Sequence, residues 1–144
     1  MEKPENCDSK GVFRRRFTVP RDAIDENGHV NNVVYVQWMQ DTAVAHSDAV
    51  GGTRAAVAAG GTWVVRSHHV EYLRPAFAGD ELMVETWVTD FRRVRSTRRY
   101  RFLRVKDGTE LARGATDWVF VNADNGRPTA VPEAVQACFT LVDD

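Results

Sequence analysis

The stretch "IDENGHVNNVVYVQW", from Ile24 to Trp38, joins a short polar segment to the beginning of a regular apolar pattern. Within it, "DENG" is a favoured type I turn sequence, because Asp is common at the first position of such a turn and Gly at the fourth. Downstream, "NVVYVQWMQDTAVAHSDAV" places apolar side chains at spacings of three and four, which predicts a helix with one buried face. We expect Asn31 or Asn32 to cap this helix and Gly51-Gly52 to end it.

Strand patterns lie on both sides of the predicted helix. Residues 12–19, "VFRRRFTV", predict a first strand that ends at Pro20. The segment "GGTRAAVAAGGT" is expected to be a flexible connection that includes no more than a turn of helix. Segments rich in Val, Trp, Tyr, Phe and Thr predict further strands at residues 63–74, 80–91, 96–106 and 109–121. This order predicts an α+β fold with an antiparallel sheet, and Asp107-Gly108 marks its clearest hairpin.

The size and charge of the chain limit its functions. Its 144 residues predict a single domain, residues 1–144, in which 1–11 form a flexible tail, and 43% hydrophobic residues are enough for a core. With 19 basic against 20 acidic side chains, we expect neither nucleic acid nor an anionic membrane surface as a partner. Cys7 and Cys138 fit neither a zinc knuckle nor a disulfide framework, so a cytoplasmic location is expected. No window is long and apolar enough to predict a signal peptide or a membrane span.

Several kinds of chemistry lack their sequence signals. There is no phosphate-binding glycine loop, no dinucleotide fingerprint and no Gly-x-Ser-x-Gly elbow. No metal site is expected, because His68 and His69 point to opposite faces of a strand and the other two histidines have no ligand at a suitable spacing. The run "RRVRSTRRYRFLR", residues 92–104, has two interpretations. It is a solvated strand face that balances acids elsewhere, which is slightly favoured, or a contact for the phosphates of a small ligand.

The polar end of the quoted stretch combines groups that are used in acyl transfer. Asp25, Asn27 and His29 bring three polar side chains into five residues, immediately before the helix. The unpaired N–H groups and partial positive charge of a helix N-terminus can polarise a carbonyl oxygen and stabilise an oxyanion. A carboxylate just upstream can attack the carbonyl carbon or activate a water molecule. The pattern therefore predicts an acyl-transfer site.

The same residues carry a family resemblance. Asp25, Gly28, Tyr35 and Trp38 match the hotdog-fold acyl-CoA thioesterases of the 4-hydroxybenzoyl-CoA thioesterase and YbgC-like group, in which an Asp-x-x-Gly turn leads into a helix. The segment "DENGHVNNVVY" is also similar to the Asp-x-Asn-x-His-Val-Asn-Asn segment of plant acyl-ACP thioesterases. The chain departs from those plant enzymes where they carry a further catalytic carboxylate, because Pro75 lies there, with Glu71 nearby. It also has room for one hotdog repeat where they have two.

The resemblance implies a fold, an assembly and a reaction. The fold is a single hotdog domain, with an antiparallel sheet of five or six strands wrapped around one long central helix. The assembly is a homodimer or homotetramer with sites between subunits. The reaction is hydrolysis of a fatty or aryl thioester of CoA, or of an acyl-ACP, to a carboxylic acid and free thiol. It needs no cofactor, because coenzyme A is part of the substrate.

Roles for individual residues follow from the motif and the resemblance. Asp25 is the predicted nucleophile or general base, and Asn27 and His29 orient water, the carboxylate or the pantetheine arm. Backbone amides around Val30 to Asn32 are predicted to hold the thioester oxygen. The predicted substrate-binding residues are Gly28, Val30, Asn31, Asn32, Tyr35 and Trp38, of which the two aromatic residues line the acyl pocket. The predicted contacts for the CoA phosphates are Arg92, Arg93, Arg95 and Arg98.

Some alternatives stay open. Asp41 is a second candidate carboxylate, although its position off the apolar stripe favours a solvent-facing residue. His46 shares the stripe, which favours a core or interface histidine with one hydrogen bond. Hotdog enoyl-CoA hydratases or dehydratases use an Asp-x-Asn-x-x-His turn, in which the histidine comes one residue later than His29. A third interpretation is a non-catalytic module that binds acyl-CoA.

Overall fold

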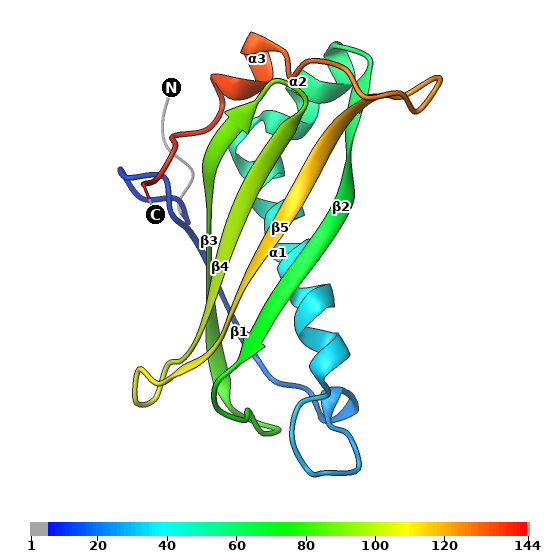
Figure 1. Ribbon diagram of the computed structural model, residues 1–144. Helices are drawn as coiled ribbons and strands as arrows, with labels where there is room; N and C mark the ends of the chain where they lie inside the picture. Colours follow the sequence, from blue (N-terminus) through cyan, green and yellow to red (C-terminus); the bar gives the residue numbers. More distant parts are fainter. Residues whose placement is uncertain (1–5, 144) are drawn as a thin grey trace.

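The computed structural model describes residues 6–143, and one antiparallel sheet dominates it (Figure 1). The order of the strands in the sheet is β1-β3-β4-β5-β2, so β1 and β2 form its edges. The strands are β1 (Phe13–Thr18), β2 (Gly61–Tyr72), β3 (Glu81–Arg92), β4 (Arg95–Arg104) and β5 (Glu110–Asn122). The sheet curves around a long helix, α1 (Asn32–Val50), which confirms the predicted α+β fold. No helix within residues 6–143 is long and apolar enough to cross a membrane.

The ends of α1 have the caps that the sequence predicts. The Asn31 side chain accepts a hydrogen bond from the Val33 amide (3.0 Å), and Gly51 ends the helix in the left-handed conformation. The buried face of the helix comprises Tyr35, Trp38, Met39, Thr42, Ala43 and His46. Gly114 of β5 lets this face approach the sheet closely, because a Cβ atom there would lie 2.9 Å from the Met39 sulfur.

The segment after α1 differs from the prediction. Gly52–Ala58 forms a second helix, α2, where a flexible connection was expected. Its run of alanines favours helix strongly enough to outweigh the flanking glycines. A third, short helix, α3 (Glu133–Gln136), lies beside α2 near the end of the chain (Figure 1). A 3-10 turn, Arg21–Ala23, links β1 to the loop that precedes α1.

The start of the described chain is folded against β1. Residues 1–5 of the predicted flexible tail lie outside the described residues. Residues 6–11 do not form a tail, because the Arg14 amide donates to the Asn6 carbonyl (2.8 Å) and the Asp8 amide donates to the Val12 carbonyl (2.9 Å). At the other end, the Val142 amide donates to the Val88 carbonyl (2.9 Å) and so continues along β3. Asn6 and Val142, near the two ends of the described chain, therefore lie at the same edge of the sheet (Figure 1).

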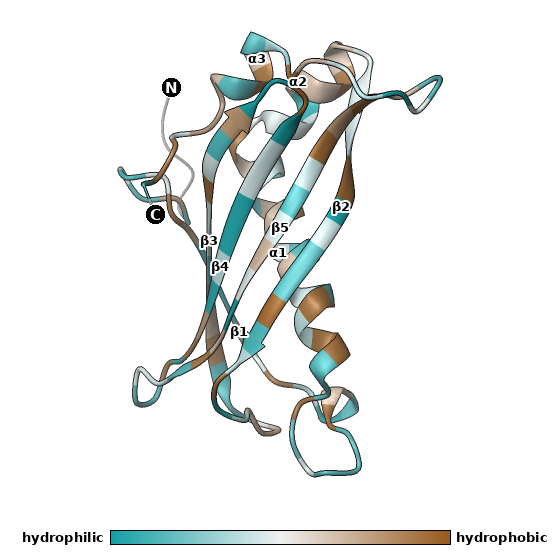
Figure 2. Cartoon of the chain, in the orientation of Figure 1, coloured by the Kyte–Doolittle hydropathy of each residue, from teal (hydrophilic) through white to brown (hydrophobic). Residues whose placement is uncertain are grey.

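The core divides into two clusters. The larger lies between α1 and the sheet and includes Tyr35, Trp38, Met39, Leu82 and Phe102. The smaller lies under α2 and α3, where Ala56, Phe120, Val131 and Val135 pack with Trp63, Phe91 and Phe139. Figure 2 shows apolar residues along the first half of α1 and a hydrophilic loop before it.

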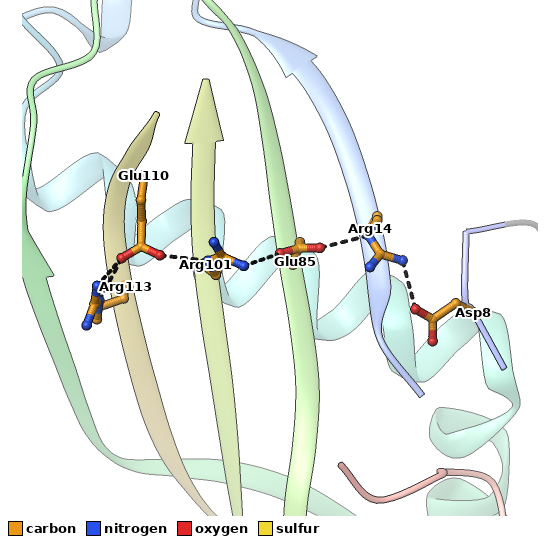
Figure 3. Close-up of polar contacts among 6 residues, drawn as sticks. All are labelled: Asp8, Arg14, Glu85, Arg101, Glu110 and Arg113. Carbon is orange, nitrogen blue, oxygen red and sulfur yellow. Dashed lines mark hydrogen bonds and ion pairs between the residues drawn. The ribbon is translucent and has the colours of Figure 1, made fainter. Parts of the chain in front are cut away.

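The outer face of the sheet carries alternating charges. Arg14 pairs with Asp8 (2.9 Å) and Glu85 (2.8 Å), and Arg101 pairs with Glu85 (3.5 Å) and Glu110 (2.6 Å). Arg113 also pairs with Glu110. These contacts form a chain of ion pairs across the strands, which Figure 3 shows. We call the six residues the outer ion chain.

Candidate active site

The loop from Ile24 to Val30 is a closed turn. Its two ends pair as an isolated β-bridge, and inside it the Asp25 amide donates to the His29 carbonyl (3.0 Å). The Gly28 amide donates back to the Asp25 carbonyl (3.0 Å). Gly28 has a φ of 85°, a left-handed conformation that glycine adopts without strain, and no atom lies within 4 Å of where its Cβ would be. The "DENG" turn prediction is therefore confirmed, and the role of Gly28 is conformational.

The Asp25 carboxylate has one fixed oxygen and one free oxygen. Its Oδ1 accepts a hydrogen bond from the Asn27 amide (2.9 Å), which holds the side chain against its own turn. Its Oδ2 has no hydrogen bond or ion pair within residues 6–143. Asn27 is exposed and His29 is half-buried, and neither side chain is hydrogen-bonded in that part of the chain. The carboxylate is thus oriented by the backbone, with one oxygen available for chemistry.

Two of the three predicted amide donors are already engaged. The Val30 amide donates to the Ala76 carbonyl and the Asn31 amide to the Ala23 carbonyl, both at 2.9 Å. The prediction that these two amides bind a thioester oxygen is therefore wrong. The Asn32 amide, at the first position of α1, has no hydrogen-bond partner among the described residues. The first N–H groups of a helix have no partner within the helix, so they can bind an anion or a polarised oxygen.

Residues 18–139 match the family described as the thioesterase-like superfamily. The chain belongs to this superfamily. A curated relative, the L-carnitine dehydrogenase/betainyl-CoA thioesterase of Ruegeria pomeroyi, is 25% identical over 125 residues. That match covers 86% of this chain and 25% of the relative, so the chain spans about a quarter of the relative's length.

Solved structures of thioesterases share the fold. The 1,4-dihydroxy-2-naphthoyl-CoA thioesterase Slr0204 from Synechocystis has a TM-score of 0.79 at 18% identity, with 89% of this chain and 95% of that chain covered. The 12:0-ACP thioesterase from Umbellularia californica has a TM-score of 0.82 at 24% identity, with 92% of this chain and 51% of that chain covered. The predicted hotdog thioesterase fold and family are therefore confirmed.

The two aromatic residues of the thioesterase-like motif are core residues here. Tyr35 is 3% exposed and meets Trp38, Tyr72 and Phe102 edge-on, with ring centroids 5.1 to 5.5 Å apart. Burial raises the pKa of Tyr35 to about 12. Trp38 packs on Phe17 with ring centroids 4.8 Å apart. Within the described chain these side chains fill the space between helix and sheet, and their role in an acyl pocket stays a prediction.

Tyr72 is a residue near the start of α1 that no local sequence pattern predicts. Tyr72, at the end of β2, donates a hydrogen bond from its hydroxyl to the Asn32 carbonyl (2.7 Å). It therefore lies next to the open Asn32 amide. The contact joins residues 40 positions apart, so no local pattern could have revealed it.

The four arginines predicted to contact CoA phosphates differ from one another. Arg92 pairs with Asp90 (3.3 Å) and Asp117 (3.6 Å), and Arg95 pairs with Asp117. Arg93 is exposed and forms no ion pair within the described residues. Arg98 is 4% exposed, inside the protein, so its assignment to a surface phosphate site is wrong.

The alternatives to Asp25 have structural roles. Asp41 is exposed and accepts a hydrogen bond from Gln37 (2.8 Å), as expected for a solvent-facing residue. His46 is buried, and its Nδ1 lies 2.8 Å from Arg98 Nη1, which confirms a core histidine. Among residues 6–143, no group of three or more His, Cys, Asp or Glu is placed to hold a metal ion.

Proposed function

We propose that this protein hydrolyses acyl thioesters and that Asp25 supplies the reacting carboxylate. The observation that carries the proposal is the free oxygen of Asp25, held one short loop before the open amide of Asn32. As a general base, Asp25 would take a proton from water as the water attacks the carbonyl carbon. As a nucleophile, it would form a mixed anhydride that water then opens. In both routes the C–S bond breaks, the acyl group leaves as a carboxylic acid and the sulfur leaves as a thiol.

The proposed substrate is a fatty or aryl acyl-CoA, with an acyl-ACP as the second possibility. The names of the relatives support both, since they include CoA thioesterases and an ACP thioesterase. His29 and Asn27 would orient the water or the pantetheine arm. Of the four predicted arginines, Arg93 is exposed and forms no ion pair within the described residues, so it is the remaining candidate for a phosphate contact. The proposal includes no cofactor and a cytoplasmic location.

A second copy of the chain is proposed to complete the site. β2 pairs only with β5 within the described chain, so its other edge presents unpaired backbone groups. Exposed apolar side chains lie near it, including Val64 on β2 and Val33 at the start of α1, which is 73% exposed. A homodimer, or a homotetramer built from two dimers, would cover this edge. Sedimentation analysis tests the proposal, and a monomer at working concentration would contradict it.

Thiol release from a panel of short, medium, long and aromatic acyl-CoAs tests the reaction. We expect Asp25→Asn to lower kcat by about 10² to 10⁴-fold, because the amide can neither accept the proton nor attack. Glu26→Gln is the matched control, since it changes the neighbouring, exposed carboxylate of the same turn and should keep the rate. Equal activity of wild type and Asp25→Asn would overturn the assignment. If the protein removes the double bond of a conjugated enoyl-CoA without releasing thiol, it is a hydratase. If it binds acyl-CoA tightly without turnover, it is a binding module.

The role of the Asn32 amide can be tested by removing only that N–H. Proline is well tolerated at the first position of a helix, and Asn31 already has the extended conformation that a following proline requires. We expect Asn32→Pro to lower kcat by about 10² to 10³-fold if the amide stabilises the oxyanion. Asn32→Ala removes the same side chain but keeps the N–H, so it should stay active. Equal rates for the two variants would exclude the amide.

A further inference from the structure

A cavity lies at the other end of α1 from the Asp25 loop. It has a volume of about 190 Å³ and lies between α1, α2 and the sheet. Its walls are mainly apolar and aromatic, formed by Val88, Trp63, Phe91, Trp118 and Phe139. An apolar cavity of about 150 Å³ is known to accommodate benzene, so this space suits a ring or a short alkyl chain with a few further atoms.

One charged side chain, Arg98, is part of the cavity wall. Its Nη1 donates to His46 Nδ1 (2.8 Å) and to Thr86 Oγ1 (3.1 Å), and both of these acceptors are neutral. Its Nε and Nη2 make no hydrogen bond, and the side chain forms no ion pair, within residues 6–143. The acidic groups that raise its pKa are the phenol of Tyr100 and the thiol of Cys7, whose sulfur lies 3.9 Å from His46 Nε2. The Phe139 ring lies 5.9 Å from the guanidinium carbon. Burial lowers the pKa of Arg98, but a guanidinium stays protonated in proteins.

His46 holds Arg98 in place without neutralising it. Because Arg98 donates to Nδ1, that nitrogen carries no proton, and the ring is the neutral Nε2–H form. Burial, with a contribution from Arg98, lowers the pKa of His46 to about 3, so the ring stays neutral. Phe13 stacks on the ring with centroids 5.1 Å apart, and Phe139 meets it edge-on at 5.3 Å. His46 is therefore a positioning residue for a buried charge.

A buried charge without a counter-ion is unfavourable unless something supplies the opposite charge. The free edge of the guanidinium, Nε and Nη2, matches the two oxygens of a carboxylate. We propose that the cavity binds a small organic carboxylate with an apolar body of roughly six to eight carbons, and that Arg98 is its counter-ion. The apolar walls would contact the body of the ligand. Because no carboxylate lies in the described walls, the guanidinium of Arg98 would pair with the carboxylate of the ligand.

This site is separate from the proposed catalytic loop of the same protomer. α1 has 19 residues and is about 28 Å long, with the loop before its first residue and the cavity against its second half. Binding at the cavity does not require Asp25 or hydrolysis. The inference therefore stands independently of the proposed function.

Three ligands of one shape test the proposal on the unmodified protein. Phenylacetate, phenylacetamide and phenylethylammonium differ mainly in the charge of the head group. Trp63 and Trp118 line the cavity, so their fluorescence, together with calorimetry, reports occupation. We expect phenylacetate to bind at least about tenfold more tightly than the amide, and the ammonium not to bind. Equal affinities for the three ligands, or binding of none, would overturn the proposal.

Variants locate the site. Arg98→Met should weaken phenylacetate binding by about tenfold or more, whereas Arg92→Met, an exposed arginine nearby, should not change it. If Arg98→Met does not fold, Val57→Glu tests the same site from its mouth, because Val57 lines the cavity and is 71% exposed. The added carboxylate should repel phenylacetate and leave the amide unaffected, relative to Val57→Gln. Asp25→Asn should bind phenylacetate like wild type, which distinguishes this site from the catalytic one. The proposal would be contradicted if Asp25→Asn lost phenylacetate binding, or if Arg98→Met or Val57→Glu bound phenylacetate as tightly as wild type.

Discussion

Arg98 and Arg101 lie on the same strand, β4, but on opposite faces of the sheet. The side chain of Arg101 is 47% exposed and lies between two carboxylates of the outer ion chain, Glu85 and Glu110 (Figure 3). Arg98 is 4% exposed, and its recorded partners are a neutral histidine and a hydroxyl. Arg101 thus has two carboxylate partners, whereas Arg98 has no ion pair within residues 6–143. A charge retained under those conditions is better explained by a ligand than by stability.

The largest expected effect concerns the packing of β4 on the inner face of the sheet, the face on which Arg98 also lies. Phe102 is fully buried on β4 and contacts Tyr35 and Trp38. We expect Phe102→Ala to lower the free energy of unfolding by about 4 kcal/mol, through lost burial and a cavity. Leu103→Ala, on the half-buried outer face, should cost about 1 kcal/mol. Urea unfolding measures both, and equal losses would remove the distinction between the faces.

The next effect is the acid sensitivity of the inner face. The pKa of His46 is about 3 in the folded protein, below its ordinary value of 6.5, because burial disfavours the charged ring. Below pH 6.5 the unfolded chain therefore binds a proton that the folded chain does not, so stability falls as the pH falls towards 3. We expect a loss of about 2 kcal/mol between pH 6.5 and about pH 5 that His46→Gln does not show. Parallel curves for the two proteins would contradict a neutral His46.

The outer face should respond to acid in a lower range. Hydrogen bonds from Arg101 lower the pKa of Glu110 below its ordinary value of 4.5. The stabilisation that ionised Glu110 gives to the folded protein is therefore complete above about pH 4.5 and is lost only as the pH falls below that value. Measurements above about pH 5 therefore separate His46 from Glu110. Burial also lowers the pKa of His68, but His68 is present in both wild type and His46→Gln, so its effect cancels in the comparison.

Local sequence signals predicted the parts of the molecule that local interactions determine. The turn at Asp25, the Asn31 cap and the left-handed Gly51 all depend on residues within a few positions of each other. The strands were predicted because their side chains fit a half-buried sheet. Asp107-Gly108 connects β4 and β5 as its turn chemistry indicates.

Two of the errors, at Val30 and Arg98, concern partners that are distant in sequence, whereas the error at α2 is local. The Val30 amide donates its hydrogen bond to the Ala76 carbonyl. The burial of Arg98 depends on the strand register, which places Arg98 opposite Val88 and Thr116 and turns its side chain inward. Charge alone predicted a surface residue, because arginines are seldom buried. Tyr35 is buried, as its helical spacing also indicates, and its role in an acyl pocket stays a prediction.

A smaller effect tests the centre of the outer ion chain. Glu85 is mostly buried and holds Arg14 and Arg101, so Glu85→Gln should lower the free energy of unfolding by about 1 kcal/mol. Glu81→Gln is the matched control on the same strand, because Glu81 pairs with Arg16 (3.0 Å) and both side chains are about half exposed. We expect the control to change stability by less than about 0.5 kcal/mol. Equal losses of stability in the two variants would mean that burial of the carboxylate does not determine how much these ion pairs stabilise the fold.

The smallest effect is expected at the end of the outer ion chain. Arg113 has a side chain that is 55% exposed, and its recorded ion-pair partner is Glu110, which keeps Arg101 when Arg113 is removed. Arg113→Met should therefore change the free energy of unfolding by less than about 0.5 kcal/mol, and the difference should vanish in about 1 M salt. A loss above about 1 kcal/mol would show that the chain acts cooperatively across the strands. The outer arginines would then stabilise the fold together, in contrast to Arg98, which forms no ion pair within residues 6–143.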